Sequence, residues 1–283
     1  MTQAIARQAL DVSAPDGHRS QILTFVPTTP RGALLFVPAL GVPARKYSAF
    51  AEALASAGVA TALHELRGLE TSNRRAGRRC DWGYPELLID LAESRAALAR
   101  EHGALRFHLG GHSLGAQLAA LELARAPMPG TGLVIAASGQ PWWRRFPALQ
   151  RPLVLAALPL VRALGALCGY FPGQRVNFGG REARSVMRDW ARTALTGRYE
   201  VARMRLDFES ALGALDAPVL ALRMTQDRLA PVGSLDHLLA KLSRARVTRD
   251  EIGPAEFARG RADHFAWLKD PIPVARRIAA WVA

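Results

Sequence analysis

One serine in the chain stands in a setting that suits nucleophilic catalysis. Residues 111–115 read Gly-His-Ser-Leu-Gly, so Ser113 occupies the centre of a G-x-S-x-G pattern. The apolar run at 105–109 predicts a strand before this pattern, and residues 116–126 predict a helix directly after it. A serine on such a sharp strand-to-helix turn is held at a strained backbone angle, and the flanking glycines let neighbouring elements approach. Ser113 is therefore the predicted nucleophile of an acyl-transfer reaction.

A serine hydroxyl is inert without a general base, and only two histidines follow Ser113 in the chain. His237 lies among leucines in a predicted helix, where a structural or surface role is expected. His264 lies in the loop between the last predicted strand and the last predicted helix. Loops at the carboxyl ends of parallel strands display the active residues of such sheets. His264 is therefore the predicted base.

The base needs an acid to orient it, and Asp227 follows a predicted strand at its carboxyl end. It also fits the chain order serine, acid, histidine. Asp207 and Glu209, at the end of a predicted insertion, remain competitors. Asp216 begins the same strand at the opposite edge of the sheet, and Asp263 adjoins the histidine too closely to orient it easily. The simpler interpretation of Asp227 is a turn-forming aspartate.

Attack on a carbonyl also requires hydrogen-bond donors for the developing oxyanion. The backbone N–H of Leu114, directly after the nucleophile, is one expected donor. The second is expected from the loop at 37–43, Val-Pro-Ala-Leu-Gly-Val-Pro, where a glycine permits a tight turn. Leu40 is the predicted donor, and Ala39 is the alternative. The same loop is also compatible with a plain strand exit that two prolines make rigid.

These residues require a parallel sheet to bring them together. Short apolar strands alternate with helical segments, a pattern typical of an α/β protein with helices on both faces of the sheet. An opening hairpin is predicted around the Asp16-Gly17 turn, with strands at 10–12 and 21–26. The later strands are predicted at 34–37, 59–66, 105–109, 132–137, 219–224 and 246–252. The helices are predicted around 47–54, 85–98, 116–126, 232–243 and 273–282.

A long insertion interrupts this alternation. Roughly 80 residues separate the strand that ends near Ala137 from the strand that starts near Pro218, far more than the ~2 to 6 residues of an ordinary connection. Helical segments are expected around 153–167 and 184–195. We therefore predict a core of sheet and helices formed by residues 1–140 and 211–283, with a helical cap insertion at 141–210.

The formal charge of +13 raises the question of nucleic-acid binding. Of the 37 basic residues, 34 are arginines, and no docking motif accompanies them, so nucleic acid is not an expected partner. The cap insertion contains twelve arginines and five acids. Two interpretations of this excess stand: a solvated arginine-rich surface, or a field that draws anionic substrates to the pocket.

Composition also bounds the setting of the chain. With 49% hydrophobic residues it has enough apolar surface for a large core. Cys80 and Cys168 fit neither a disulfide scaffold nor a four-ligand zinc site. No secretory signal is visible, and Pro159 and Arg162 interrupt the most apolar stretch, so no integral membrane segment is expected. A cytoplasmic location is predicted, and the oligomeric state is not specified.

The Gly111–Gly115 motif, together with Asp227 and His264, resembles the α/β-hydrolase superfamily, and the resemblance covers nearly the whole chain. Residues 64–72, His-Glu-Leu-Arg-Gly-Leu-Glu-Thr-Ser, are similar to its D-x-R-G-x-G-x-S segment, with glutamates in place of the aspartate and the second glycine. Residues 38–43 and 81–84 are closest to bacterial hydrolases of the monoacylglycerol-lipase or serine-aminopeptidase-like type. The usual H-G-x-G oxyanion loop is here Pro-Ala-Leu-Gly at 38–41, which places its third position at Leu40.

The resemblance implies an α/β-hydrolase fold and a serine hydrolase that cleaves a carboxylic ester or thioester through an acyl-enzyme on Ser113. Such an enzyme needs no metal or organic cofactor, and its partner is a small-molecule ester. An acyltransferase with the same triad and a non-catalytic binding member of the fold are the alternatives. The segment 81–84, Asp-Trp-Gly-Tyr, either borders the pocket or forms a helix N-terminus.

Overall fold

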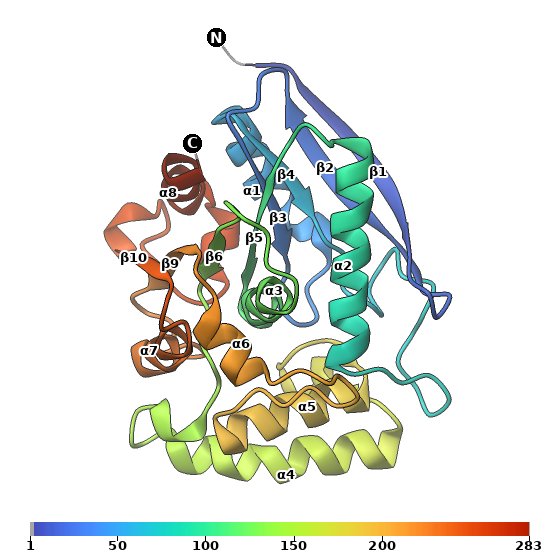
Figure 1. Cartoon of the computed structure of the whole chain (residues 1–283). Coiled ribbons are helices and arrows are strands. Elements are labelled where there is room, and N and C mark those ends of the chain that lie inside the picture. Colours follow the sequence, from blue (N-terminus) through green and yellow to red (C-terminus); the bar gives the residue numbers. More distant parts are fainter. Residues whose placement is uncertain (1–2, 283) are drawn as a thin grey trace.

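An eight-stranded sheet forms the centre of the molecule in this computed structural model, which describes residues 3–282 (Figure 1). The strand order is β1-β2-β4-β3-β5-β6-β9-β10. The strands are β1 (Ile5–Ser13), β2 (Arg19–Pro27), β3 (Gly32–Val37), β4 (Val59–Leu63), β5 (Phe107–His112), β6 (Leu133–Ala136), β9 (Pro218–Met224) and β10 (Arg246–Ile252). The pairs β1–β2 and β2–β4 are antiparallel, and all other neighbours are parallel. The predicted α/β fold with a mostly parallel sheet is confirmed.

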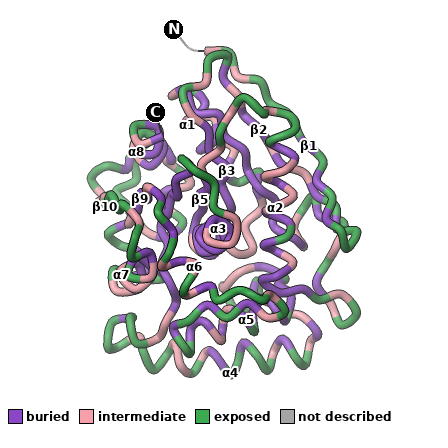
Figure 2. Tube along the Cα trace, viewed as in Figure 1, coloured by how far each residue is buried: buried purple, intermediate pink, exposed green. Residues whose placement is uncertain are grey.

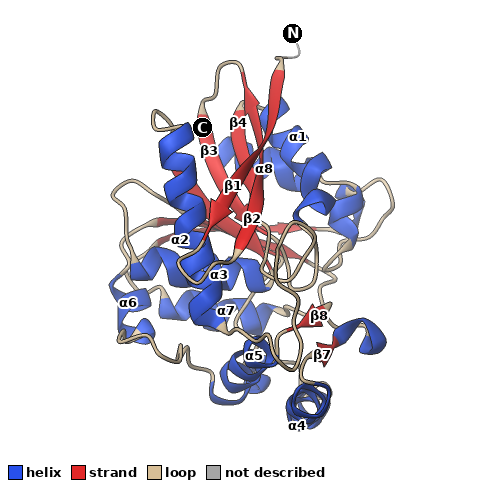
Figure 3. Ribbon diagram, turned by 90° about the vertical axis from the view of Figure 1, so that its right-hand side faces the viewer, coloured by secondary structure: helices blue, strands red, loops and turns tan. Residues whose placement is uncertain are grey.

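Helices cover both faces of this sheet (Figure 3). They are α1 (Ser48–Ser56), α2 (Tyr84–Glu101), α3 (Leu114–Arg125), α7 (Val232–Lys241) and α8 (Ile272–Val282). Strand β3 shows why, because its side chains alternate between two cores. Leu35 and Val37 belong to the cluster that contains residues of α2 and α3, whereas Leu34 and Phe36 belong to the cluster of α1 and α8. A strand that is apolar on both faces requires a helical layer on each side.

Strand β5 differs from its prediction, since it runs through residues 107–112 rather than 105–109. Gly110 and Gly111, which suggest a turn, instead continue the pairing with β3 and β6. A Cβ atom at Gly110 would lie 2.8 Å from the Cβ of Val134, so the glycine lets the strands pack closely. The strand therefore extends directly to Ser113.

The chain between β6 and β9 contains α4 (Arg151–Cys168), the short strands β7 (Phe171–Pro172) and β8 (Arg181–Glu182), α5 (Arg184–Thr196) and α6 (Phe208–Ala214). In Figure 1, α4 and α5 lie below the sheet, with α4 outermost. Figure 2 shows that exposed residues recur along α4, whereas α3 is buried. We call residues 141–210 the cap. The strands β7 and β8 have two residues each, too few to leave a periodic pattern in the sequence.

A buried ionic network fixes the loop after β4. Arg67 donates to both carboxylate oxygens of Asp90 on α2, at 2.8 and 2.7 Å, and His18 contacts the same carboxylate at 2.9 Å. Burial raises the pKa of Asp90, but the hydrogen bonds from Arg67 and His18 outweigh it and hold this pKa below its usual value. The other ring nitrogen of His18 lies 2.9 Å from the hydroxyl of Ser72. The arginine and serine of the 64–72 segment thus have structural roles.

Candidate active site

Ser113 lies on a sharp turn between β5 and α3, with φ 55° and ψ −123°. This left-handed backbone is rare for a non-glycine residue and stores strain. The turn also requires both flanking glycines. A Cβ at Gly111 would lie 2.4 Å from the carbonyl carbon of Gly115, and a Cβ at Gly115 would lie 2.1 Å from the carbonyl oxygen of Val37. The local geometry is that of a nucleophile elbow.

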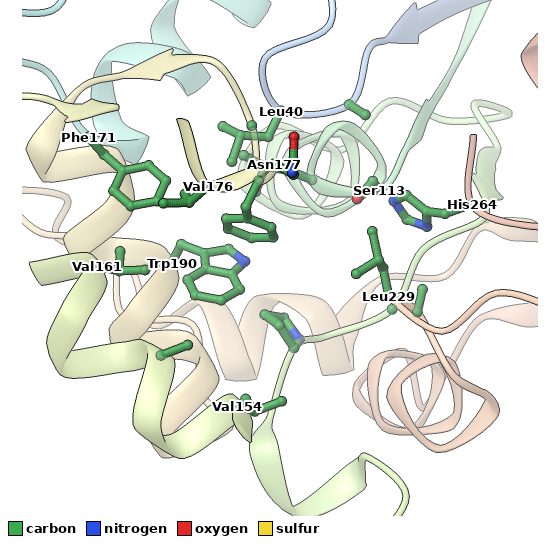
Figure 4. Close-up of a pocket in the computed structure, with 18 of the residues that line it drawn as sticks. Leu40, Ser113, Val154, Val161, Phe171, Val176, Asn177, Trp190, Leu229 and His264 are labelled. Atoms are coloured by element: carbon green, nitrogen blue, oxygen red, sulfur yellow. The ribbon is translucent and has the colours of Figure 1, made fainter. Parts of the chain in front are cut away.

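His264 and Asp227 form a buried pair, with His264 Nδ1 2.7 Å from Asp227 Oδ2. The other carboxylate oxygen of Asp227 accepts the backbone N–H groups of Leu229 and Ala230, at 2.8 and 2.9 Å. Asp227 therefore stabilises a turn with one carboxylate oxygen and contacts His264 with the other. The turn-forming aspartate and the partner of the histidine, which the sequence offered as alternatives, are compatible. Figure 4 shows the side chains of Ser113 and His264 at one end of a cavity.

The competing acids are engaged elsewhere. Asp207 caps α6 and accepts the backbone N–H groups of Glu209 and Ser210. Glu209 pairs with Lys241 and accepts the N–H of Tyr199. Asp263 accepts the N–H groups of the two residues at 265 and 266 and pairs with an arginine. None of these three carboxylates contacts His264.

His237 also has a structural environment. Its Nε2 lies 3.1 Å from the carbonyl oxygen of Gly197, and its ring lies against Trp142, with 4.6 Å between the ring centroids. This residue joins α7 to the cap.

In the loop after β3, the N–H groups of Leu40 and Gly41 make no hydrogen bond to the described residues, and of these two residues Leu40 lines the cavity. The N–H of Ala39 donates to the hydroxyl of Tyr47 at 2.9 Å, so Ala39 is not available to an oxyanion. Within the described residues, the N–H groups of Leu40 and Leu114 make no hydrogen bond. Both of these residues line the cavity together with Ser113. The N–H groups of Leu40 and Leu114, the donors expected from the sequence, thus have no partner among the described residues.

Sequence reasoning missed the role of Tyr47, which it treated only as an apolar helix position. Its hydroxyl lies 2.8 Å from Nδ1 of His112. Burial raises the pKa of Tyr47, and burial together with the neighbouring His264 lowers the pKa of His112 well below its usual value. The hydroxyl therefore stays protonated and donates a hydrogen bond to the neutral imidazole of His112. No motif marks such a contact in the sequence.

The cavity has a volume of about 380 Å³ and lies between the core and the cap. Its wall is mostly apolar (Figure 4), with Gln117 and Asn177 as polar side chains besides Ser113 and His264. The cap contributes residues of α4, among them Val154, Ala157, Val161 and Leu164, together with Phe171 and Trp190. Among the described residues that line it, none is an aspartate or glutamate. The described part of the chain also has no group of three or more histidine, cysteine or acidic side chains placed to hold a metal ion.

The segment 81–84 does not line the cavity, and it anchors the cap instead. Gly83 caps α2, whose Glu86 accepts the Gly83 N–H at 2.7 Å. The carboxylate of Asp81 accepts the N–H of Ser185 at the start of α5 and pairs with Arg184. Of the two interpretations of this segment, the helix N-terminus is the one that fits.

Fold and site together define an α/β-hydrolase. The model of the serine aminopeptidase family S33, whose members are α/β-hydrolases, matches residues 28–252, and the chain belongs to this family. No protein of curated function is similar enough in sequence to match the chain. The resemblance to bacterial hydrolases of this branch is confirmed.

Solved structures share the fold at low sequence identity. An esterase from Exiguobacterium antarcticum superposes with a TM-score of 0.62 and 13% identity, over 97% of this chain and 99% of that one. A putative aryl esterase from Burkholderia cenocepacia gives 0.59 and 18%, over 97% and 98%. A membrane phospholipase A described as a bacterial virulence factor gives 0.60 and 20%, over 98% and 85%.

Proposed function

We propose that this protein is a serine hydrolase that cleaves a carboxylic ester or thioester with a largely apolar acyl group. The observation that carries the proposal is the convergence of three features on one cavity. These are the strained backbone of Ser113, the pairing of His264 with Asp227, and the mostly apolar wall of the cavity, whose volume is about 380 Å³. Such a site suits acyl transfer rather than mere binding, because binding alone needs no oriented imidazole beside a serine.

In the proposed reaction, His264 takes the proton of the Ser113 hydroxyl as its oxygen bonds to the substrate carbonyl carbon. The N–H groups of Leu40 and Leu114 stabilise the negative charge on the former carbonyl oxygen. Collapse of this intermediate breaks the ester bond, and the leaving alcohol or thiol receives the proton from His264. Water, deprotonated by His264, then cleaves the acyl-enzyme and releases the acid. Asp227 keeps the proton of Nδ1 in place throughout.

The cavity favours an ester over an aminoacyl amide. An aminopeptidase must hold the charged α-amino group of its substrate, and a carboxylate is the usual partner of a buried ammonium. The described residues of the cavity wall supply none. The esterases among the structural relatives support the same chemistry, as proteins of the same fold.

The test compares wild type with Ser113→Ala. A fluorophosphonate probe should label wild type at Ser113, and p-nitrophenyl esters should be hydrolysed. The variant should lose labelling and lose activity by several orders of magnitude. An aminoacyl p-nitroanilide should be a poor substrate. Labelling that persists in Ser113→Ala would refute the nucleophile, and acyl transfer to an added alcohol in preference to water would identify an acyltransferase.

A further inference from the structure

Helix α4 turns a continuous apolar surface toward solvent. Leu153, Leu160 and Leu167, spaced seven residues apart, are 71%, 55% and 69% exposed, and Leu149 just before the helix is 91% exposed. The exposed positions of the helix fall on one arc, because residues three, four and seven apart share a face. The apolar residues of this arc are Pro152, Leu153, Ala156, Pro159, Leu160, Ala163, Ala166 and Leu167. Exposed leucines at such a density are unusual for a surface that faces only water.

The opposite side of α4 packs against the rest of the protein. Leu158 and Val161 are buried against α5 and the cap interior, and Leu164 lines the cavity. By length and composition alone α4 is apolar enough to cross a membrane, and in the described chain it is the one helix that meets this criterion. Its packing against α5 fits a helix that lies along a surface rather than one that passes through a bilayer.

Every charged residue in the segment around α4 is basic. Residues 141–181 contain six arginines and no aspartate or glutamate. All six are exposed, namely Arg144, Arg145, Arg151, Arg162, Arg175 and Arg181. Arg151 and Arg162 lie at the edge of the apolar arc of α4. Arg144 also lies beside the tryptophans that open the cap, 5.2 Å from the ring centroid of Trp143.

We propose that α4 and Leu149 form a docking surface for an anionic phospholipid bilayer, with the helix in the plane of the headgroups. Leucines on the arc would enter the acyl boundary, and the arginines would meet lipid phosphates. A second copy of this chain fits less well, because pairing two such faces would bring Arg151 and Arg162 of both helices together, and α4 contains no acid to pair with them. An anionic bilayer satisfies both the apolar area and the charge.

The same geometry indicates a route by which substrate reaches the cavity, and this inference rests on the proposed function. Leu153 and Leu160 are largely exposed, yet both also line the cavity. The cavity mouth therefore borders the docking surface. An ester dissolved in the bilayer would reach Ser113 along α4 without crossing water.

The test is flotation of the full chain with vesicles of phosphatidylcholine, alone or with about 30 mol % phosphatidylglycerol. Wild type should float with the anionic vesicles. Leu149→Ser/Leu167→Ser, at two positions outside the cavity wall, should weaken binding about tenfold or more. Arg151→Gln/Arg162→Gln should weaken it by about fivefold per arginine.

Matched controls lie at the opposite, amino-terminal edge of the sheet. Met128→Ser/Val247→Ser removes exposed apolar side chains there, and Arg100→Gln/Arg244→Gln removes exposed charge. Neither should change vesicle binding. Equal losses in control and cap variants would show unspecific attraction and overturn the proposal. A dimer, measured by light scattering, that disappears in Leu149→Ser/Leu167→Ser without vesicle binding would assign the face to a second copy.

Hydrolysis of a short, water-soluble ester separates docking from the proposed function. All four variants should retain it, since none alters a residue of the site. Full hydrolysis without vesicle binding overturns the docking surface alone. Vesicle binding in a wild-type protein that hydrolyses no ester leaves the docking surface standing and refutes the proposed function.

Discussion

The hydroxyl of Tyr47 connects the loop that carries Leu40 to His112, the residue before Ser113. It accepts the N–H of Ala39 at 2.9 Å and donates to His112 Nδ1 at 2.8 Å. The segment that follows β3 and the end of β5 are thus joined through one oxygen atom. This contact takes up the Ala39 N–H, whereas the N–H of Leu40, a residue that also lines the cavity, has no partner among the described residues.

Replacement of Tyr47 by phenylalanine should lower kcat by about tenfold to a hundredfold with little change in KM. Without the hydroxyl, the loop loses its anchor and the Leu40 N–H is less well aimed, an effect felt mainly in the transition state. Stability should also fall by about 1–3 kcal/mol, since two buried polar groups lose their partner. Steady-state kinetics and urea unfolding measure the two effects.

Tyr84→Phe is the matched control for this substitution. Tyr84 is equally buried, but its hydroxyl makes no hydrogen bond to the described residues. Its removal should leave kcat unchanged. An unaltered kcat in Tyr47→Phe, or an equal loss in both variants, would contradict the anchoring role.

Asp227→Asn should preserve the fold and reduce kcat by up to ~10⁴-fold. The asparagine carbonyl oxygen can still accept the N–H groups of Leu229 and Ala230, but its amide then faces His264 Nδ1 and stabilises the wrong tautomer. Asp207→Asn and Glu209→Gln should retain wild-type kcat in the same ester assay. A large loss in either of these, with Asp227→Asn still active, would mean that the acid is misassigned.

Two substitutions on the cavity side of α4 should shift chain-length preference in opposite directions. Leu164→Ala enlarges the cavity, and Ala157→Leu reduces it. A buried methylene contributes about 0.8 kcal/mol, so kcat/KM should change roughly fourfold for each methylene gained or lost. A series of p-nitrophenyl esters measures the preference. If the order of preference is the same in both variants, α4 does not contact the acyl chain.

Glu182→Gln should stabilise the protein above neutral pH. Burial raises the pKa of this carboxyl to about 7, against 4.5 for the free group, although the N–H of Gly180 opposes the rise. The folded state therefore keeps a proton that the unfolded state releases, and stability falls as the pH rises from 4.5 to 7. The variant does not lose this free energy of unfolding, which amounts to on the order of 3 kcal/mol once the pH is well above 7.

Urea unfolding at about pH 5 and about pH 8 measures this difference. The variant should gain on wild type mainly at the higher pH. Glu65, whose pKa burial also raises to about 7, has the same slope in both proteins and cancels in the comparison. A difference that does not change with pH would show that Glu182 is already ionised in the fold.

The sheet and the three residues proposed for catalysis were accessible from the sequence because each leaves a local mark. Ser113 stands near two glycines that the turn requires, β3 is apolar throughout, and β9 is apolar except at Arg223. Asp227 and His264 each follow a strand of the parallel sheet, so topology alone brings them to one edge.

Other features depend on contacts that no spacing encodes. Tyr47 looks like any apolar helix residue, and its function lies in a hydroxyl that meets His112, 65 positions away. The hairpin of β7 and β8 has strands of two residues, and its pairing depends on the turn between them. The end of β5 was misplaced because paired glycines suggest a turn, whereas here they permit close strand packing.

Gly41 has φ +73°, and a Cβ there would lie 2.2 Å from the backbone nitrogen of Gly180 in the cap. Glu182 accepts the N–H of Gly180 and so fixes the cap backbone at this point. This backbone packs directly against Gly41 and limits the conformation of the loop that contains Leu40. A chimaera that receives the cap of a relative would have to keep residues 179–182 or lose the loop geometry. The insertion is therefore constrained at this strip of backbone, which together with Glu182 supplies the three atoms nearest to a Cβ at Gly41.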